Sequence, residues 1–275
     1  MRKFAFCAIL PTLISSQKES FALIAKRHAR LFFLSGNYKE RCFYMATSRK
    51  SNIEKYVGIA VFSALAYAVA FVCNAFIPPV AGFLSLDVKD SIIAIASFIY
   101  GPISAVMISL IAALVELITF STTAWYGFIM NFVSSAVFSL TASLIYKRHR
   151  NINGALFSLF AATVATTGVM LLLNSLITPL YLIAFFGIPD ELARSQVMDM
   201  LPTVLLPFNF AKALLNSAVA MMMYKPLATA LRMTKLVSGG RSALKFNKKS
   251  LVILAVGVVA ATVAVGIILW LNSPK

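Results

Sequence analysis

The feature that most constrains this chain is a series of apolar segments, several of which reach the roughly 20 residues that a helix needs to cross a bilayer. A helix satisfies its own backbone hydrogen bonds, so segments of this length predict membrane-spanning helices. Of the 275 residues, 60% are hydrophobic and 12% are charged, and the mean hydropathy is +0.86. The sequence therefore predicts an all-α integral membrane protein that crosses the bilayer several times.

Positive charge is concentrated in a few short segments between the apolar ones. A net charge of +16 would suggest nucleic-acid binding in a soluble chain, but this distribution is typical of cytoplasmic loops. We therefore expect the residues before Tyr56, the segment Lys147–Arg150 and the linker 236–249 in the cytoplasm. The acidic-leaning loops 87–90 and 190–199 then lie outside. This multi-pass topology puts the N-terminus in the cytoplasm and the C-terminus outside the cell membrane.

Seven apolar segments follow one another along the chain. We expect a six-helix bundle and one additional C-terminal transmembrane helix. The second segment is short, so we expect it to include Asp90 and Ser91, to be tilted, or to be re-entrant. Residues 190–199 are expected to form a mixed-charge loop. The expected spans are Tyr56–Ile77, Ile92–Tyr100, Gly101–Phe120, Phe128–Tyr146, Ala155–Phe186, Leu201–Leu231 and Leu251–Leu271.

Residues 1–44 differ from the rest of the chain. They begin like a signal peptide, but the lysines and arginines that follow should remain in the cytoplasm. We interpret them as an N-terminal extension that is either untranslated, with Met45 as the true start, or loosely ordered. Residues 45–235 then form the six-helix membrane domain, 236–249 a basic cytoplasmic linker, and 250–275 the extra helix with a short tail.

The segment Leu205–Tyr224 carries three polar residues on one helical face. Asn209, Lys212 and Asn216 recur at i, i+3 and i+7. A lysine inside a membrane span costs roughly 2.5–3.5 kcal/mol on insertion scales, so by default it marks a functional site. The alternative is a lysine that snorkels to the interface. In the topology above, Asn174 reaches the same outer half of the membrane, so the sequence predicts a polar pocket open to the outside.

Catalytic chemistry has little support in the sequence. The only histidines, His28 and His149, lie in the extension and a cytoplasmic loop, and the three cysteines form no metal-ligand cluster. No GxxxxGK[ST] motif occurs, so the chain cannot bind ATP through a P-loop. Glu116 is expected at the interface, with a hydrogen bond to a ligand or to Lys212 as the alternative. Amides and one ammonium remain, and they suit a flat heterocycle with N–H, C=O and ring nitrogens.

The first span carries a stripe of small residues. Ala60, Ala64 and Ala68 are spaced four apart, and such a stripe lets another membrane helix approach closely. Spacing alone does not distinguish packing within this chain from docking of a partner protein.

Several short motifs between Met45 and about Leu231 resemble, in order and spacing, the substrate-binding S component of an energy-coupling factor (ECF) vitamin transporter. The closest likeness is to the riboflavin-specific type. The motifs that carry it are Leu84-Ser85-Leu86-Asp87-x-x-Asp90, Gly101-Pro102, Gly127-x-x-x-Asn131-Phe132, Leu173-Asn174 with Thr178-Pro179-Leu180-Tyr181, Leu206-Pro207-Phe208-Asn209-x-x-Lys212, and Met223-Tyr224-Lys225.

The resemblance implies a six-helix fold that holds riboflavin from the outer side as a transported substrate, with no other cofactor and no metal. It also implies docking onto a transmembrane coupling subunit that works with two cytoplasmic ATPase subunits, through the stripe of Ala60 and Ala64, to which we add Ala68. In that family, residues matching Asn174, Asn209 and Lys212 bind the isoalloxazine ring. The remaining expected substrate contacts are Ser85, Asp87, Gly127, Asn131, Thr178 and Asn216.

Three alternatives remain open at the level of sequence. The ligand could be FMN or another vitamin. The chain could be a flavin-binding subunit that serves extracellular electron transfer instead of nutrition. It could also be a membrane enzyme for a lipid substrate, although such sites need clustered carboxylates or histidines and Glu116 stands alone.

Overall fold

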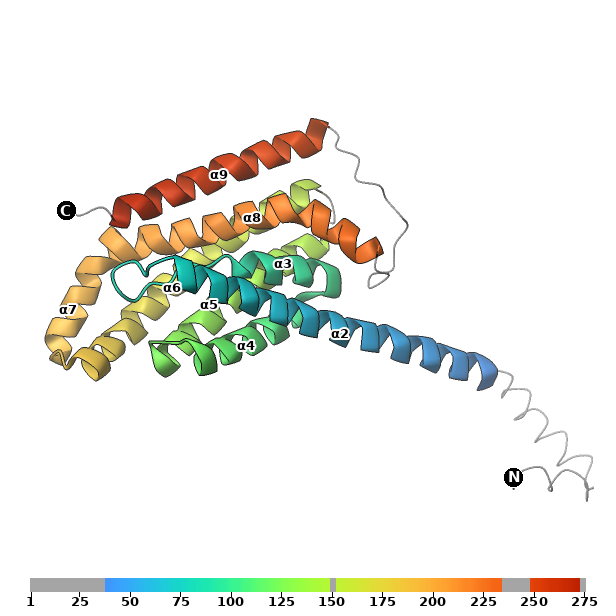
Figure 1. Ribbon diagram of the computed structural model, residues 1–275, viewed down its shortest axis with the longest axis horizontal. Coiled ribbons are helices and arrows are strands. Elements are labelled where there is room, and N and C mark those ends of the chain that lie inside the picture. Colours follow the sequence, from blue (N-terminus) through green and yellow to red (C-terminus); the bar gives the residue numbers. More distant parts are fainter. Residues whose placement is uncertain (1–37, 149–151, 234–247, 273–275) are drawn as a thin grey trace, which may run out of the picture. The chain divides into compact units, whose positions relative to one another are not determined.

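The computed structural model describes residues 38–148, 152–233 and 248–272, which consist of helices joined by short connections (Figure 1). The chain divides into two compact units, residues 1–53 and 54–275. Within the described residues no sheet forms, and the single strand-like feature is an antiparallel bridge between Val80 and Leu84. The predicted all-α class is therefore confirmed.

The helices follow the predicted segments closely. Among the residues that the structure describes, five stretches are long and apolar enough to cross a membrane, and they lie at Ile53–Phe76, Pro102–Thr119, Ala124–Arg148, Asn153–Phe186 and Asp190–Met223. In chain order the helices are α2 (Tyr38–Phe76), α3 (Lys89–Tyr100), α4 (Pro102–Thr119), α5 (Ala124–Arg148), α6 (Ile152–Phe186), α7 (Asp190–Met200), α8 (Leu206–Met233) and α9 (Lys248–Asn272).

The short second segment is the central helix α3. Its 12 residues span about 18 Å at 1.5 Å per residue, too little to cross a bilayer alone. Side chains such as Ile93 and Ile95 are fully buried, because α3 packs against α2, α4, α5 and α8. The predicted break at Gly101 is confirmed: its φ of 95° suits glycine, and Pro102 begins α4.

The expected loop 190–199 is wrong, because these residues form helix α7. Asp190 and Glu191 occupy its first turn, where carboxylates are favourable, and Arg194 pairs with Asp190 at 2.9 Å. Ala193 and Val197 are buried on its inner face. A π-helical turn at Leu201–Leu205 then leads into α8, so the sixth apolar segment is preceded by a helix.

The C-terminal helix α9 lies alongside α8 (Figure 1). The two backbones approach closely at Gly257, where an added Cβ would lie 3.0 Å from Met222 Cγ and 3.3 Å from the Ala218 carbonyl oxygen. Ala264 and Ile268 are buried farther along the same helix. Small residues therefore allow α9 to cover the face of α8 that carries Ala218 and Met222.

Two domain predictions fall largely outside the described residues. The structure describes the extension 1–44 only from Tyr38, where α2 begins, so Met45 lies within a helix. The linker 236–249 is described only from Lys248, the first residue of α9. His28 and His149 also lie outside the described residues.

The close approach of α9 and α8 can be tested with two glycines of α9. We expect Gly257→Leu to lower the thermal unfolding temperature of the detergent-solubilised protein, because overpacking costs about 1–3 kcal/mol. Gly266→Leu is the control, since nothing lies within 4 Å of a Cβ at that position and both changes alter helix propensity equally. Equal unfolding temperatures for the two variants would contradict the described packing.

Candidate functional site

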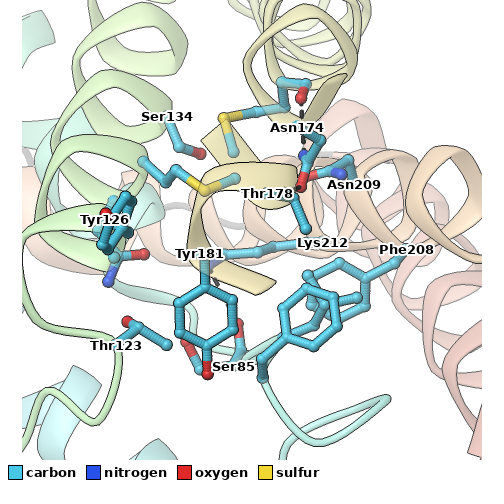
Figure 2. Close-up of a pocket in the computed structure, with 16 residues that line it drawn as sticks. Ser85, Thr123, Tyr126, Ser134, Asn174, Thr178, Tyr181, Phe208, Asn209 and Lys212 are labelled. Carbon is cyan, nitrogen blue, oxygen red and sulfur yellow. Dashed lines mark hydrogen bonds between the residues drawn. The ribbon is translucent and has the colours of Figure 1, made fainter. Parts of the chain in front are cut away.

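A pocket lies between the connection that precedes α3 and the helices α5, α6 and α8 (Figure 2). It lies near the N-terminal ends of α3, α5 and α8 and in the second half of α6. Seven of the nine predicted substrate-binding residues line it: Ser85, Gly127, Asn131, Asn174, Thr178, Asn209 and Lys212. The structure therefore brings together residues that are up to 127 positions apart in sequence.

The two asparagines of α6 and α8 have fixed orientations. Asn174 donates one amide N–H to the Met170 carbonyl at 2.7 Å and accepts a hydrogen bond from Thr178 Oγ1 at 3.0 Å. Asn209 donates to the Leu205 carbonyl at 2.7 Å. An amide has two N–H donors and two lone pairs, so each side chain retains a donor and acceptor capacity for a ligand. Figure 2 shows Asn174, Thr178 and Asn209 grouped at one side of the pocket.

The ammonium of Lys212 is held inside the protein. Its Nζ lies 2.8 Å from Asp87 Oδ2 and 3.2 Å from the Ser85 carbonyl oxygen, and the residue is only 8% exposed. The snorkelling alternative is therefore wrong. Burial by itself raises the pKa of Asp87, but the ammonium groups of Lys212 and Lys89 outweigh it, so the pKa lies below the usual value of a carboxyl group.

Asp87 and Asn216 support the pocket without lining it. The Asn216 amide donates to the carbonyl oxygens of Asp87 and Lys212, each at 3.0 Å, and accepts from the Ser91 backbone N–H at 2.9 Å. Asn216 thus connects α8 to the start of α3, and Asp87 holds Lys212. The helical face of Asn216 was predictable from spacing, but the distance of Asp87 and Asn216 from the cavity depends on the path of the connection before α3.

The sequence suggested that Glu116 lies at the membrane interface, but the structure buries it inside the protein. It is 3% exposed and its two carboxylate oxygens accept hydrogen bonds from Lys89 Nζ at 2.6 and 2.5 Å. Asn131, which lines the pocket, donates to Glu116 Oε2 at 3.3 Å. In the sequence, Lys89 belongs to a charged segment that was expected to form an exposed loop. No sequence signal marks its side chain as buried. The buried pair fixes one edge of the Asn131 amide.

Aromatic side chains form much of the remaining wall, and sequence reasoning did not assign them to the site. Tyr181 lies at its centre, with ring centroids 6.1 Å from Phe83 and 6.2 Å from Tyr126. Phe208 also lines the pocket. Tyr181 and Phe208 occur inside the motifs quoted above, which is the signal that could have identified them.

The alanine stripe of α2 faces away from the other helices. Ala60, Ala64 and Ala68 are all exposed, whereas Ile59 and Phe62 on the opposite face are buried against α3 and α4. Within the part of the chain that the structure describes, this stripe is therefore not used for internal packing.

Comparison with known proteins gives consistent matches. The profile of the family described as "ECF transporter, substrate-specific component" matches residues 55–224. The riboflavin transporter RibU of Staphylococcus aureus (strain TCH60) is 30% identical over 191 residues, which cover 67% of this chain and 97% of the relative. The riboflavin transporter FmnP of Bacillus subtilis (strain 168) is 28% identical over 170 residues, which cover 61% and 88%.

A solved structure described as "Structure and mechanism of the S component of a bacterial ECF transporter" matches with a TM-score of 0.53 and 28% identity, over 66% of this chain and 99% of that one. The fold therefore matches that of an S component. Helix α9 lies beyond the residues that the family profile covers.

The buried pair of Lys89 and Glu116 allows a test of the site's framework. We expect Lys89→Met and Glu116→Leu each to destabilise the protein by about 3–5 kcal/mol, because each leaves a buried charge without its partner. The double variant should recover most of this loss, since it leaves neither charge. Thermal unfolding in detergent measures all three. A double variant that is as unstable as the sum of the two single variants would contradict the pairing.

Proposed function

The chain belongs to the family of ECF transporter substrate-specific components, and we propose on this basis that it captures riboflavin at the outer face of the cell membrane for uptake. The observation that carries the proposal is the pocket itself. It combines three asparagine amides and one ammonium with aromatic walls. The two relatives are named riboflavin transporters, which supports the same ligand.

The chemistry of the pocket suits an isoalloxazine ring. That ring is flat and aromatic, and one edge alternates carbonyl oxygens, ring nitrogens and an N–H group. Asn174 and Asn209 offer both donors and acceptors to such an edge, and Lys212 offers a charged donor. Tyr181 and Phe208 offer faces or edges for ring contacts.

A non-helical connection forms part of the pocket wall. The cavity volume is about 70 Å³. Phe83, Leu84 and Ser85 belong to the connection between α2 and α3, which is not part of a helix and carries residues of positive φ at Ala81 and Gly82. Lys212 holds this connection against α8 through Asp87 and the Ser85 carbonyl oxygen, so the wall that it forms is fixed at its Ser85 end.

We assign substrate contacts to Asn174, Asn209 and Lys212, with Asp87 and Asn216 as supporting residues. The other assigned contacts are Ser85, Gly127, Asn131 and Thr178. Riboflavin is here a transported substrate and not a resident cofactor. The family consists of transport components, so the chain is not an enzyme. The membrane-enzyme alternative also loses its one carboxylate candidate, because Glu116 is paired with Lys89.

Uptake requires energy from partner subunits. The sequence has no P-loop, so we propose a transmembrane coupling subunit and two cytoplasmic ATPase subunits as partners. The exposed stripe of Ala60, Ala64 and Ala68 is the proposed docking face, since small residues let another helix approach closely.

The proposed topology has six helices in the substrate-binding domain, residues 45–235, and α9 as a seventh crossing. Lysine and arginine distribution supports a cytoplasmic N-terminus, which puts the pocket outside and the C-terminus after α9 outside as well. In this arrangement the linker 236–249 lies in the cytoplasm.

Substitutions in the pocket test the proposed ligand. We expect Lys212→Ala to weaken riboflavin binding by roughly 10- to 150-fold, because a lost hydrogen bond to a charged donor costs about 1.5–3 kcal/mol. Asn209→Ala should weaken it by roughly 2- to 13-fold, because a hydrogen bond between neutral groups contributes about 0.5–1.5 kcal/mol. Ser175→Ala is a control next to Asn174, because its hydroxyl bonds to the Leu172 carbonyl and does not line the pocket. Quenching of flavin fluorescence gives the affinities, and FMN titrated in parallel identifies the preferred flavin. Unchanged affinity in both pocket variants would place the ligand elsewhere.

A bulky residue in the alanine stripe tests the docking face. We expect Ala64→Trp to abolish co-purification with the coupling subunit and cellular uptake, while flavin affinity stays within about twofold because the pocket lies on other helices. Val164→Trp is the control, since Val164 is 53% exposed on α6, away from the stripe. Normal uptake by the Ala64 variant would refute the assignment.

A further inference from the structure

A second cavity lies at the opposite end of the helices from the flavin pocket. It encloses about 310 Å³, room for about ten water molecules, and is lined by the ends of α3 and α5, the start of α4 and one turn of α2. The flavin pocket is lined by the connection that precedes α3, whereas this cavity is lined by Tyr100, the last residue of α3. On α5, residues 126–134 line the first and residues 143–147 the second. The two sites therefore lie toward opposite faces of the membrane.

Two lysines from separate helices line this cavity. Lys55 comes from α2 and is half-buried, and Lys147 comes from the last turn of α5 and is exposed at the rim. Among the described lining residues none is acidic. Two ammonium groups around one cavity repel each other, and an anion between them would turn this repulsion into attraction. The charge pattern therefore fits an anionic ligand.

The lining of the cavity includes an exposed apolar side chain. Ile103, at the start of α4, is 70% exposed. Tyr100 and Tyr146 also line it, and tyrosines commonly lie at the level of lipid headgroups. A small soluble anion has no apolar part to pack against such a side chain, whereas a lipid has its acyl chains.

We propose that this cavity binds the phosphate group of an anionic phospholipid, with the acyl chains leaving past Ile103. Basic pockets between helices on the cytoplasmic side are a known form of lipid recognition, and the lysine distribution puts this end of the helices in the cytoplasm. The lipid bridges α2 and α5 through Lys55 and Lys147. Because Lys55 lies five residues before Ala60 on α2, the bound headgroup steadies the same helix that carries the alanine stripe.

The test uses the full chain purified in a neutral detergent. Phosphatidylglycerol, phosphatidylcholine and inorganic phosphate are added separately, and thermal unfolding and native mass spectrometry report binding. We expect phosphatidylglycerol to raise the unfolding temperature and to give a one-lipid adduct. The double variant Lys55→Ala/Lys147→Ala should bind it roughly 30-fold more weakly, since each basic group near an anionic lipid contributes about one factor of five.

Arg148→Ala is the matched control, because Arg148 is exposed next to Lys147 and does not line the cavity. Its affinity for phosphatidylglycerol should equal that of the unaltered protein. Equal losses in Arg148→Ala and the double variant would overturn the site in favour of diffuse surface charge. Equal stabilisation by phosphatidylcholine would overturn the anionic preference, and stabilisation by inorganic phosphate alone would overturn the lipid. Each variant is compared only when its size-exclusion profile is monodisperse. None of these measurements uses flavin binding, so the result is independent of the proposed flavin site.

Discussion

The ion pair between Lys212 and Asp87 is the contact on which the rest of the structure depends. An ammonium inside a membrane protein must be paired, and the partner here lies on the connection before α3, 125 residues away. Pairing therefore draws this connection against α8. Asn216 reinforces it through the Asp87 carbonyl oxygen and the Ser91 N–H. The pocket forms next to this junction, and Ser85 of the connection and Asn209 of α8 both line it.

A second set of polar contacts fixes the short helix α3 within the apolar bundle. Ser135 of α5 bonds to Asp90 at 2.5 Å, and Ser143 bonds to the Ser97 carbonyl oxygen at 3.1 Å. Ser135 lies one turn after Asn131 on the same face of α5, and Ser143 lies about two turns farther along, displaced by about 80° around the helix. Lipid is as apolar as the helix surfaces, so hydrogen bonds and small residues specify how helices pack in a bilayer. Polar contacts of α5 therefore extend from the pocket, which Asn131 lines, to the lysine-lined cavity, which Ser143 lines.

The two ends of the molecule thus have different chemistry. The end that carries the polar pocket presents amides and aromatic rings, and two buried ion pairs lie beside it. The other end presents lysines beside an exposed apolar surface, which fits a charged headgroup with acyl chains. Helix α2 contributes to the second end and exposes its alanines, whereas the pocket is built from other elements.

The sequence alone determined the helical class, the multi-pass character and most of the pocket, because apolar length and helical spacing are local properties. Asn209 and Lys212 on one face, and Asn174 at the same depth, follow from spacing and topology. Only the tertiary structure decided which charges are buried together. Lys89 and Glu116 are 27 residues apart, and their pairing depends on how α3 packs against α4. Tyr181 and Phe208 stand inside the motifs that carry the family resemblance, but only the packing of the neighbouring helices shows that their rings line the pocket.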